Sequence, residues 1–300
     1  MNYHSPVLAK ECLDALSVKK DGVYVDATFG GGGHSRLILK ELGDDGRLYA
    51  FDQDDDALKN LPDDERLIFN HHNFRYLKRF LRLHGVRMVD GILADLGVSS
   101  HQLNEAERGF SFRFEAALDM RMNRQDAKTA ADVLNTYSAT DLQRVFGEYG
   151  EVRNAKTLAR RIVQQRTLKP IQSTADFMLV LESLIRGQRN RYLAQAFQAL
   201  RIEVNDEMGA LKEFLEASVE VLKPGGCLVV LSYHSVEDRV VKNFLKTGNT
   251  AGEVKKDFFG KIERPFTLIY KGVVTPSEEE LVRNPRSRSA KLRAGMKNDV

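Results

Sequence analysis

Four consecutive glycines, Gly30–Gly33, stand between a short apolar segment and a helical pattern. Glycine adds nothing to a core and costs backbone entropy on folding, so such a run indicates a tight turn that a ligand approaches closely. A second apolar segment, residues 47–51, ends in Asp52, about 20 residues after the first glycine. In nucleotide-binding folds an acid at this distance accepts hydrogen bonds from ribose hydroxyls. The glycines and the acid together predict a ligand that contains a nucleoside.

The residues around the glycines narrow the choice of nucleoside ligand. A phosphate-binding P-loop requires a lysine after its last glycine and an earlier glycine five residues before it, but His34 and Thr28 occupy these places. A dinucleotide fingerprint would carry Gly or Ala where this chain has Ser35, which weakens that interpretation without excluding it. S-Adenosylmethionine has a ribose and no phosphate, and needs only close backbone approach and the acid. A glycine-rich hairpin tip would make the position of Asp52 a coincidence.

Two further strand ends carry polar side chains. In an open α/β sheet, ligands bind beyond the carboxyl ends of the strands. Asp95 ends an apolar segment at 88–94, and the segment Ser232–Ser235 ends another. A lone aspartate is more often a helix cap or turn residue, but Asp95 stands where the strand–helix alternation stops, which favours a functional role. His34 and His234, taken singly, are more often structural residues than bases.

Alternating strand and helix patterns over the first hundred residues predict a parallel sheet covered by helices, which is an α/β fold. The expected strands are residues 23–28, 47–52, 66–70 and 88–94, and the expected helices are residues 35–42, 55–60 and 75–84. From Asn104 to about Asn205 helical patterns dominate, most clearly at residues 157–166 and 175–185. We therefore predict an all-helical subdomain, residues 105–204, inserted into a Rossmann-like domain formed by residues 1–104 and 205–300.

The alternation resumes after the insert. An apolar helical stripe from Met208 to Leu222 ends at Pro224, and residues 227–233 read as a buried strand. Residues 264–271 read as a strand at or near a sheet edge, because Pro265 cannot donate to a ladder. The tail from Pro285 lacks periodicity, and we expect it to be ordered only in part.

Composition limits the class of protein and of partner. The two cysteines, Cys12 and Cys227, are isolated, which fits a reducing cytoplasm and speaks against structural zinc, and no metal site is expected. No signal pattern or membrane-length apolar run is visible. Residues 151–201 carry ten Lys and Arg against three acids, in a chain of net charge +3, and the tail after Leu281 is basic too. Two basic regions favour a polyanion, most simply nucleic acid, as partner.

Several segments, in order along the whole chain, resemble the RsmH (MraW) family of bacterial S-adenosylmethionine-dependent methyltransferases. They are His4–Leu8, Asp26–Ser35, Asp95–Ser100, Arg108–Phe112, Leu118–Met122, Gln198–Asn205, Tyr233–Ser235 and Asn284–Arg293. The resemblance implies a class I methyltransferase fold with a helical insert. It also implies methylation of N4 of a cytidine in 16S ribosomal RNA, in the decoding centre (P site) of the small subunit.

The resemblance also implies roles for single residues. The cofactor contacts would be Gly32, Gly33 and His34 in the turn, Asp52 on the ribose, Phe74 against the adenine, and Asp95 and Gln102 closing the site. The glycines and Asp52 follow from the pattern alone. Phe74 and Gln102 rest on the resemblance and could otherwise be ordinary loop residues.

Methylation of an exocyclic amine requires a hydrogen-bond acceptor, because the nitrogen lone pair is delocalised into the cytosine ring. Asp95 or a carbonyl in Leu96–Gly97 is the expected acceptor. Four residues are supporting candidates for the catalytic set: Ser99, Ser100, Tyr233 and His234. DNA amino-methyltransferases carry Pro-Pro and an aromatic residue after the acid or serine here, and this chain does not.

The target base must leave its stack to reach the methyl group. Phe110 and Phe112 could form a stacking wall for it, or could equally anchor the insert.

Two other functions stay open on the residues alone. One is a nicotinamide-dependent oxidoreductase, and the other is a non-catalytic RNA-binding factor with a relic nucleoside pocket. The sequence leaves undecided whether the substrate is naked RNA or an assembled particle. It also leaves the oligomeric state open, a homodimer included.

Overall fold

The computed structural model describes residues 6–254 and 264–299, so His4 and Ser5 of the first family segment lie outside the described residues. The chain divides into two compact units: unit 1 comprises residues 1–97 and 209–300, and unit 2 comprises residues 98–208. Within the two described ranges, no helix combines the length and the apolar character that a membrane span requires.

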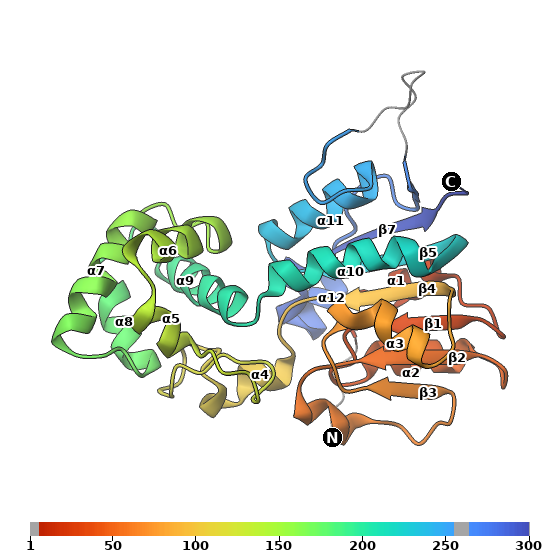
Figure 1. Ribbon diagram of the computed structural model, residues 1–300, viewed down its shortest axis with the longest axis horizontal. Coiled ribbons are helices and arrows are strands. Elements are labelled where there is room, and N and C mark those ends of the chain that lie inside the picture. The colour runs from red at the N-terminus through yellow and green to blue at the C-terminus, as the bar shows by residue number, and fades with distance from the viewer. Residues whose placement is uncertain (1–5, 255–263, 300) are drawn as a thin grey trace. The chain divides into compact units, whose positions relative to one another are not determined.

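Unit 1 is built on a seven-stranded sheet with the order β3-β2-β1-β4-β5-β7-β6 (Figure 1). The strands are β1 (Val23–Asp26), β2 (Arg47–Phe51), β3 (Leu67–Asn70), β4 (Val89–Asp95), β5 (Leu222–Ser232), β6 (Phe266–Leu268) and β7 (Lys291–Lys297). Strands β1 to β5 are parallel, and β7 is antiparallel to both of its neighbours. The order 3-2-1-4-5 is that of a Rossmann-like sheet, which confirms the predicted class I methyltransferase fold.

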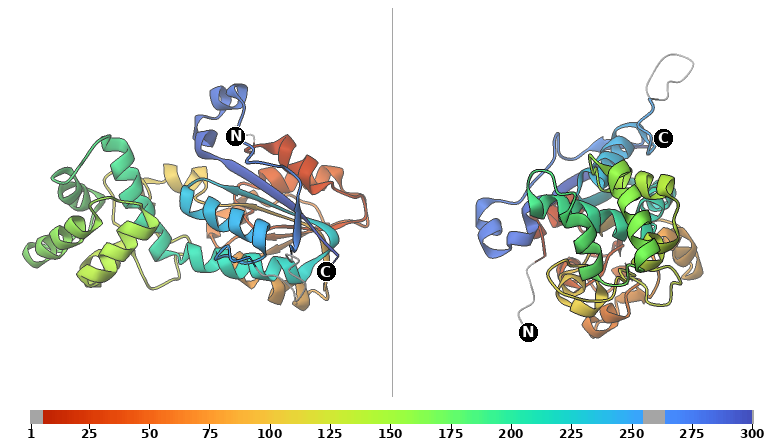
Figure 2. Two further views of the ribbon diagram at one scale, coloured as in Figure 1. Left: turned by 90° about the horizontal axis from the view of Figure 1, so that it is seen from above. Right: turned by 90° about the vertical axis from the view of Figure 1, so that its left-hand side faces the viewer.

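Helices cover both faces of this sheet. Those of unit 1 are α1 (Ala9–Leu16), α2 (Gly33–Glu41), α3 (Leu77–Leu83), α11 (Ser235–Thr247) and α12 (Glu278–Arg283). Helix α10 (Glu207–Val221) also belongs to unit 1, except for its first two residues, which belong to unit 2. Figures 1 and 2 show α1 and α2 on one face and α3 and α10 on the other. Strands β4 and β5 are buried along almost their whole length because helices cover them on both sides. Because β1, β2, β4 and β5 are parallel, their carboxyl ends lie together at one edge of the sheet.

The predicted strands and helices of the first hundred residues are present, with small shifts at their ends. The segment at 55–60 is a 3-10 helix rather than an α-helix. The strand predicted at 264–271 is shorter, and it is an edge strand as expected.

The expectation of a partly ordered tail was wrong. Residues 291–297 form β7, which lies inside the sheet between β5 and β6. Its apolar Leu292 and Ala294 are buried, and Lys291 and Arg293 contact Asp238 of α11 at 3.5 and 2.6 Å. The alternation of basic and apolar residues in this segment is thus the pattern of a β-strand. Its basic residues form ion pairs with Asp238, which is distant in sequence.

Unit 2 is helical. It contains α4 (Ser100–Asn104), α5 (Ala130–Thr136), α6 (Ala139–Arg144), α7 (Ala155–Leu168), α8 (Thr174–Glu182) and α9 (Arg189–Val204), with a π-helical turn at Val145–Tyr149. Across residues 98–208 there is no extended strand, only an isolated bridge between Ala117 and Ser173. One apolar core, with Phe146 and Phe177 stacked in it, joins the helices.

Candidate active site

The glycine turn and the acid predicted to act with it are in direct contact. Gly30 and Gly32 have φ of +51° and +72°, values in the left-handed region that side chains disfavour. The N–H of Gly30 donates to Oδ2 of Asp52 at 2.7 Å, and the N–H of Asp54 donates to Oδ1 at 2.9 Å. Each carboxylate oxygen retains a further lone pair, so Asp52 can hold the turn and accept ligand hydroxyls as well.

The four glycines differ in what they do. A Cβ on Gly32 would lie 2.8 Å from the Phe29 ring, and one on Gly33 would lie 3.2 Å from Cβ of Pro6. Gly31 has open space around it and no positive φ. The geometry therefore explains Gly30, Gly32 and Gly33, and leaves position 31 free.

The turn is also tied from outside by residues that sequence reasoning missed. The Arg36 guanidinium donates to the carbonyls of Gly31 and Asn60, both at 2.6 Å. The Asn60 side chain in turn donates to the carbonyl of Gly30 at 3.2 Å. These bonds fix the main chain of the turn without filling the space above it.

Asp95, at the end of β4, lies between two of the predicted site residues. The Tyr233 hydroxyl donates to Oδ1 of Asp95 at 2.7 Å, and Nδ1 of His34 lies 3.7 Å from Oδ2. The other ring nitrogen of His34, Nε2, is 3.0 Å from the carbonyl of Val7, and it must donate there because a carbonyl only accepts. The N–H of Asp95 donates to Thr28 Oγ1 at 2.6 Å, which joins β4 to the residues that follow β1.

Three carboxyl groups gather at this edge without a strong cation. Burial raises the pKa of Asp26, Asp52 and Asp95 above the ordinary range, and that of Asp52 to about 6. None of the three forms an ion pair with Lys or Arg in the part of the chain that the structure describes. Asp26 is held by Ser35, whose hydroxyl donates to it at 2.6 Å. A cation bound at this edge would favour the ionised form of these carboxyl groups.

Phe74 lies at the end of β3, beside the loop that carries Asp52. Its half-buried ring packs edge-on against Phe214 of α10, with 5.2 Å between centroids. The preceding Asn73 donates from its side-chain amide to Gln53 at 2.8 Å, linking the loops after β2 and β3. The structure thus places Phe74 at the same edge as the glycine turn.

His234 has a structural role at the start of α11. Its Nδ1 accepts from the N–H of Glu237 at 3.3 Å, and its Nε2 lies 3.1 Å from Oε1 of the same residue. The other oxygen of Glu237 accepts the N–H of Tyr233 at 3.1 Å. The buried Glu237, which sequence reasoning did not single out, therefore orients Tyr233 toward Asp95.

The remaining predicted residues belong to unit 2, where they form a helix cap. Ser99 Oγ accepts from the N–H of Gln102 at 3.1 Å, and Gln102 Oε1 accepts from the N–H of Ser99 at 2.9 Å. This capping box begins α4, and the pattern Ser-x-x-Gln could have revealed it in the sequence. Ser100 is the first residue of α4, and its side chain lies outside the described part of the structure.

The aromatic residues of unit 2 favour an anchoring role. Phe110 is only 6% exposed and belongs to the core of unit 2, with the Arg108 guanidinium 5.6 Å from its ring centroid. Phe112 is half-buried and packs edge-on against Phe197. Phe114, by contrast, is 43% exposed. Phe110 is thus unavailable as a stacking surface, whereas the side chain of Phe114 is exposed to solvent.

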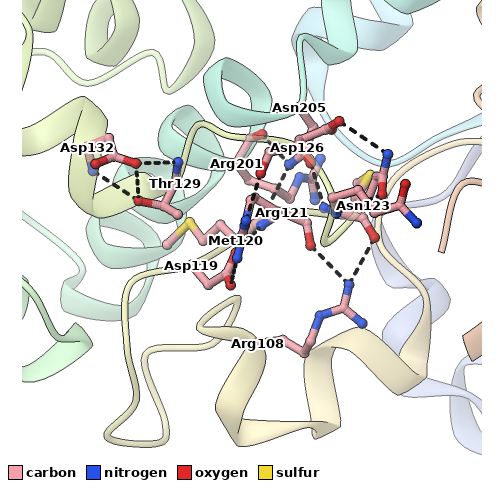
Figure 3. Close-up of polar contacts among 12 residues, drawn as sticks. Arg108, Asp119, Met120, Arg121, Asn123, Asp126, Thr129, Asp132, Arg201 and Asn205 are labelled. Carbon is pink, nitrogen blue, oxygen red and sulfur yellow. Dashed lines mark hydrogen bonds and ion pairs between the residues drawn. The ribbon is translucent and has the colours of Figure 1, made fainter. Parts of the chain in front are cut away.

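A buried network joins three of the family segments in unit 2 (Figure 3). Asn205 accepts the N–H of Met122 at 2.7 Å and donates to the carbonyl of Met120 at 2.8 Å. Arg108 donates to the carbonyls of Arg121 and Met122 at 3.0 and 3.1 Å. The side chains of Arg108 and Asn205 therefore hold the segment 118–122 from both sides.

The basic residues of unit 2 divide into two groups. Some are used inside the unit: Arg166 caps two carbonyls, and ion pairs join Lys169 to Asp176, Arg189 to Glu182 and Arg201 to Glu207. Others form no ion pair with any described residue and are exposed, and these are Arg153, Lys156, Arg160, Arg161, Arg186 and Arg191. Four of the second group lie on or just before α7, a helix that contains no acid.

Comparison with known proteins places the chain in a family. The model of the MraW methylase family matches residues 1–298. A relative from Bacteroides fragilis, ribosomal RNA small subunit methyltransferase H, is 55% identical over 296 residues, covering 98% of this chain and 97% of the relative. The protein of the same name from Bacteroides thetaiotaomicron is 54% identical over 298 residues, covering 99% and 98%. A crystal structure of an rRNA methylase from Streptococcus thermophilus has 12% identity and a TM-score of 0.41, covering 97% and 94%. The resemblance noted in the sequence is therefore confirmed, and the chain belongs to the MraW methylase family.

Proposed function

We propose that this chain transfers the methyl group of S-adenosylmethionine to N4 of a cytidine of 16S ribosomal RNA, in the decoding centre of the small subunit. Membership of the methylase family and the names of relatives 54–55% identical support methylation of small-subunit ribosomal RNA. The position of the methyl group and of the nucleotide rest on the family resemblance of the segments around Asp95, Leu118–Met122 and Tyr233.

The single observation that carries the choice of cofactor is the cluster of Asp26, Asp52 and Asp95, which has no Lys or Arg partner within residues 6–254 and 264–299. A sulfonium cation fits such a site, because its positive charge favours the ionised form of these carboxyl groups. The pyrophosphate of a nicotinamide dinucleotide would add negative charge to them, which disfavours the oxidoreductase alternative. A Cβ at Gly31 would meet no atom within 4 Å, so the turn is open at this position.

The residues proposed to hold the cofactor are Gly32, Gly33, His34, Asp52, Phe74, Asp95 and Gln102. Asp52 would accept the ribose hydroxyls with the lone pairs that the turn leaves free. Phe74 would offer its half-buried ring to the adenine. When bound, S-adenosylmethionine supplies a methyl group that is already activated by the sulfonium, so the protein mainly aligns the reactants and excludes water.

Asp95 is the proposed acceptor of the cytosine amine. A hydrogen bond from the amine to Oδ2 would direct the nitrogen lone pair away from the ring and toward the methyl carbon. Burial raises the pKa of Asp95, so its carboxylate is a better proton acceptor than an exposed one. The Tyr233 hydroxyl, whose own pKa burial raises, stays protonated and holds Oδ1. Ser99, Ser100 and His234 remain supporting candidates, with His234 acting through the position of Tyr233.

Unit 2 is the proposed substrate-recognition subdomain. On α7 the exposed Lys156 and Arg160 are four residues apart and so lie on one face, roughly 6 Å from each other along the axis. Like charges at this spacing destabilise a helix slightly, so their presence without an acid favours an anionic partner. We expect these cations to contact phosphates of the ribosomal RNA.

Labelled methyl transfer to small-subunit particles, followed by analysis of the modified nucleoside, tests the proposal. We expect N4-methylcytidine at one position and a loss of at least about 10²-fold in rate for Asp95→Ala, as for removal of a general base. Asp45→Ala, which removes an exposed acid of unit 1, is the matched control. Near-normal turnover by the Asp95 variant would exclude Asp95 from the chemistry. Absence of transfer by the native protein, with RNA binding retained, would favour the non-catalytic alternative.

A further inference from the structure

Two adjoining hollows lie on unit 1 outside the candidate active site, on the face of the sheet that α3 and α10 cover. Their volumes are about 510 and 640 Å³, and they share Lys78 and Arg82. We call the two together the α3 groove, and define it by Arg75, Tyr76, Lys78, Arg79, Arg82 and Arg87. Both volumes are in the range of about 300–1,000 Å³ that ligand pockets occupy.

The α3 groove is formed by a basic stretch of unit 1. Residues 71–88 contain five Lys and Arg and no Asp or Glu. All five cations line the hollows. The net positive charge per residue is therefore higher over residues 71–88 than over residues 151–201 of unit 2.

Only part of this charge stabilises the fold. Arg75 pairs with Glu213 at 2.8 Å and Lys78 pairs with Glu220, so these two cations tie α3 to α10. Arg79, Arg82 and Arg87 are exposed and form no ion pair with any described residue. Three cations thus stay available to a partner after the internal pairs are satisfied.

One end of the α3 groove lies next to the part of the candidate active site that belongs to unit 1. Arg75 and Tyr76 directly follow Phe74 at the carboxyl edge of the sheet, and Arg87 lies two residues before β4 begins at the opposite edge. The free cations are spread along this path and do not converge on one point. Such a distribution suits a polymeric anion better than a single phosphate group.

Tyr76 adds an aromatic surface beside the cations. Its side chain is 44% exposed and lines the hollow that also contains Arg75 and Arg79. Cations interleaved with an exposed ring are the features that single-stranded nucleic acid binds, with phosphates on the cations and a base on the ring.

We propose that the α3 groove binds the backbone of ribosomal RNA next to the target nucleotide, with Arg79, Arg82 and Arg87 on phosphates and Tyr76 under a base. This rests on the proposed function, since it takes the same RNA as the partner. It adds a second RNA surface, on unit 1, to the one proposed for α7.

The test compares RNA binding by the native protein with that of a triple variant, Arg79→Gln, Arg82→Gln and Arg87→Gln. Binding of in vitro transcribed 16S ribosomal RNA is measured over a range of salt concentrations. Loss of three phosphate contacts to a single strand lowers the slope of log K against log salt by about 2 and weakens binding roughly 50-fold at about 0.15 M salt. Tyr76→Ala should weaken binding on the order of tenfold with an unchanged slope.

The matched control is Lys10→Gln, Lys20→Gln and Lys40→Gln, which removes three exposed charges, two of them on α1 and α2 across the sheet from α3. A salt slope for the groove variant equal to that of the native protein would overturn the proposal, as would an equal loss in the control. Cofactor uptake by calorimetry reports that each variant is folded. RNA binding is measured independently of methyl transfer. A native protein that fails to methylate would therefore refute the proposed function, whereas the binding comparison would still test the α3 groove.

Discussion

Replacing Tyr233 with Phe removes one hydroxyl from the candidate active site and little else. That hydroxyl donates to Oδ1 of Asp95 at 2.7 Å, and the phenyl ring retains the packing of the side chain. The hydrogen bond favours the ionised carboxyl group, whereas burial favours the neutral one and raises its pKa. Without the donor, the pKa of Asp95 rises further.

The size of the effect follows from the charge of the acceptor. A hydrogen bond to an ionised group contributes about 1.5–3 kcal/mol, and one pKa unit corresponds to about 1.4 kcal/mol. Losing this contribution should therefore raise the pKa of Asp95 further. The chemical step needs the ionised carboxyl and is lost as pH falls through this pKa. The acidic limb of the pH–rate profile should therefore move to higher pH.

Single-turnover methyl transfer measured from pH 5 to pH 9 provides the assay. Tyr270→Phe is the control, because it also removes a partly buried phenol of unit 1, one that donates to the carbonyl of Glu11 at 3.0 Å. We expect the Tyr233 variant to regain most of its rate at high pH and the control to follow the native profile. An acidic limb that stays in place for Tyr233→Phe would refute the role of the hydroxyl.

Three further predictions concern the turn, the ribose acid and the core of unit 2. Gly31→Ala should bind cofactor as the native protein does. Gly32→Ala should bind cofactor at least tenfold more weakly in calorimetry, because its Cβ would lie 2.8 Å from the Phe29 ring. Equal binding by the two variants would contradict the geometry. Cofactor affinity should fall as pH drops below about 6, where Asp52 becomes protonated. The affinity of Asp52→Asn should depend less on pH. A native affinity independent of pH would exclude the Asp52 carboxylate as a ligand of the cofactor. Asn205→Ala should lower the free energy of unfolding by about 2–4 kcal/mol in denaturant titrations, because it removes two buried hydrogen bonds, one to the N–H of Met122 and one to the carbonyl of Met120. The exposed Asn190→Ala serves as its control, and a similar small loss in both would count against the network.

Sequence reasoning succeeded where the signal is local. Short apolar runs bounded by glycine and acids located β1 to β4, and the spacing of Gly30 and Asp52 led to a pair that the structure joins by a hydrogen bond. It failed at β7, because the charges of Lys291 and Arg293 are balanced by Asp238, more than 50 residues away. No local pattern reports such a partner.

The candidate site divides in the same way. The contact of Tyr233 with Asp95 depends on β5 lying beside β4, which the order of strands in the chain does not determine. Ser99 and Gln102 show the opposite case, because a capping pattern readable in the sequence accounts for both side chains. Their part in the chemistry stays a prediction.

The place of β7 in the sheet has a consequence for how the protein reaches its native state. Ser232 pairs with Lys291, 59 residues later, so β5 has a bare edge until that distant segment docks. Closing so long a connection is slow, and an unpaired apolar strand is a template for association with other chains. Newly made protein should therefore be most prone to aggregation during this interval. Substitutions that weaken β7 should reduce the yield of soluble protein more than they reduce the activity of the molecules that fold.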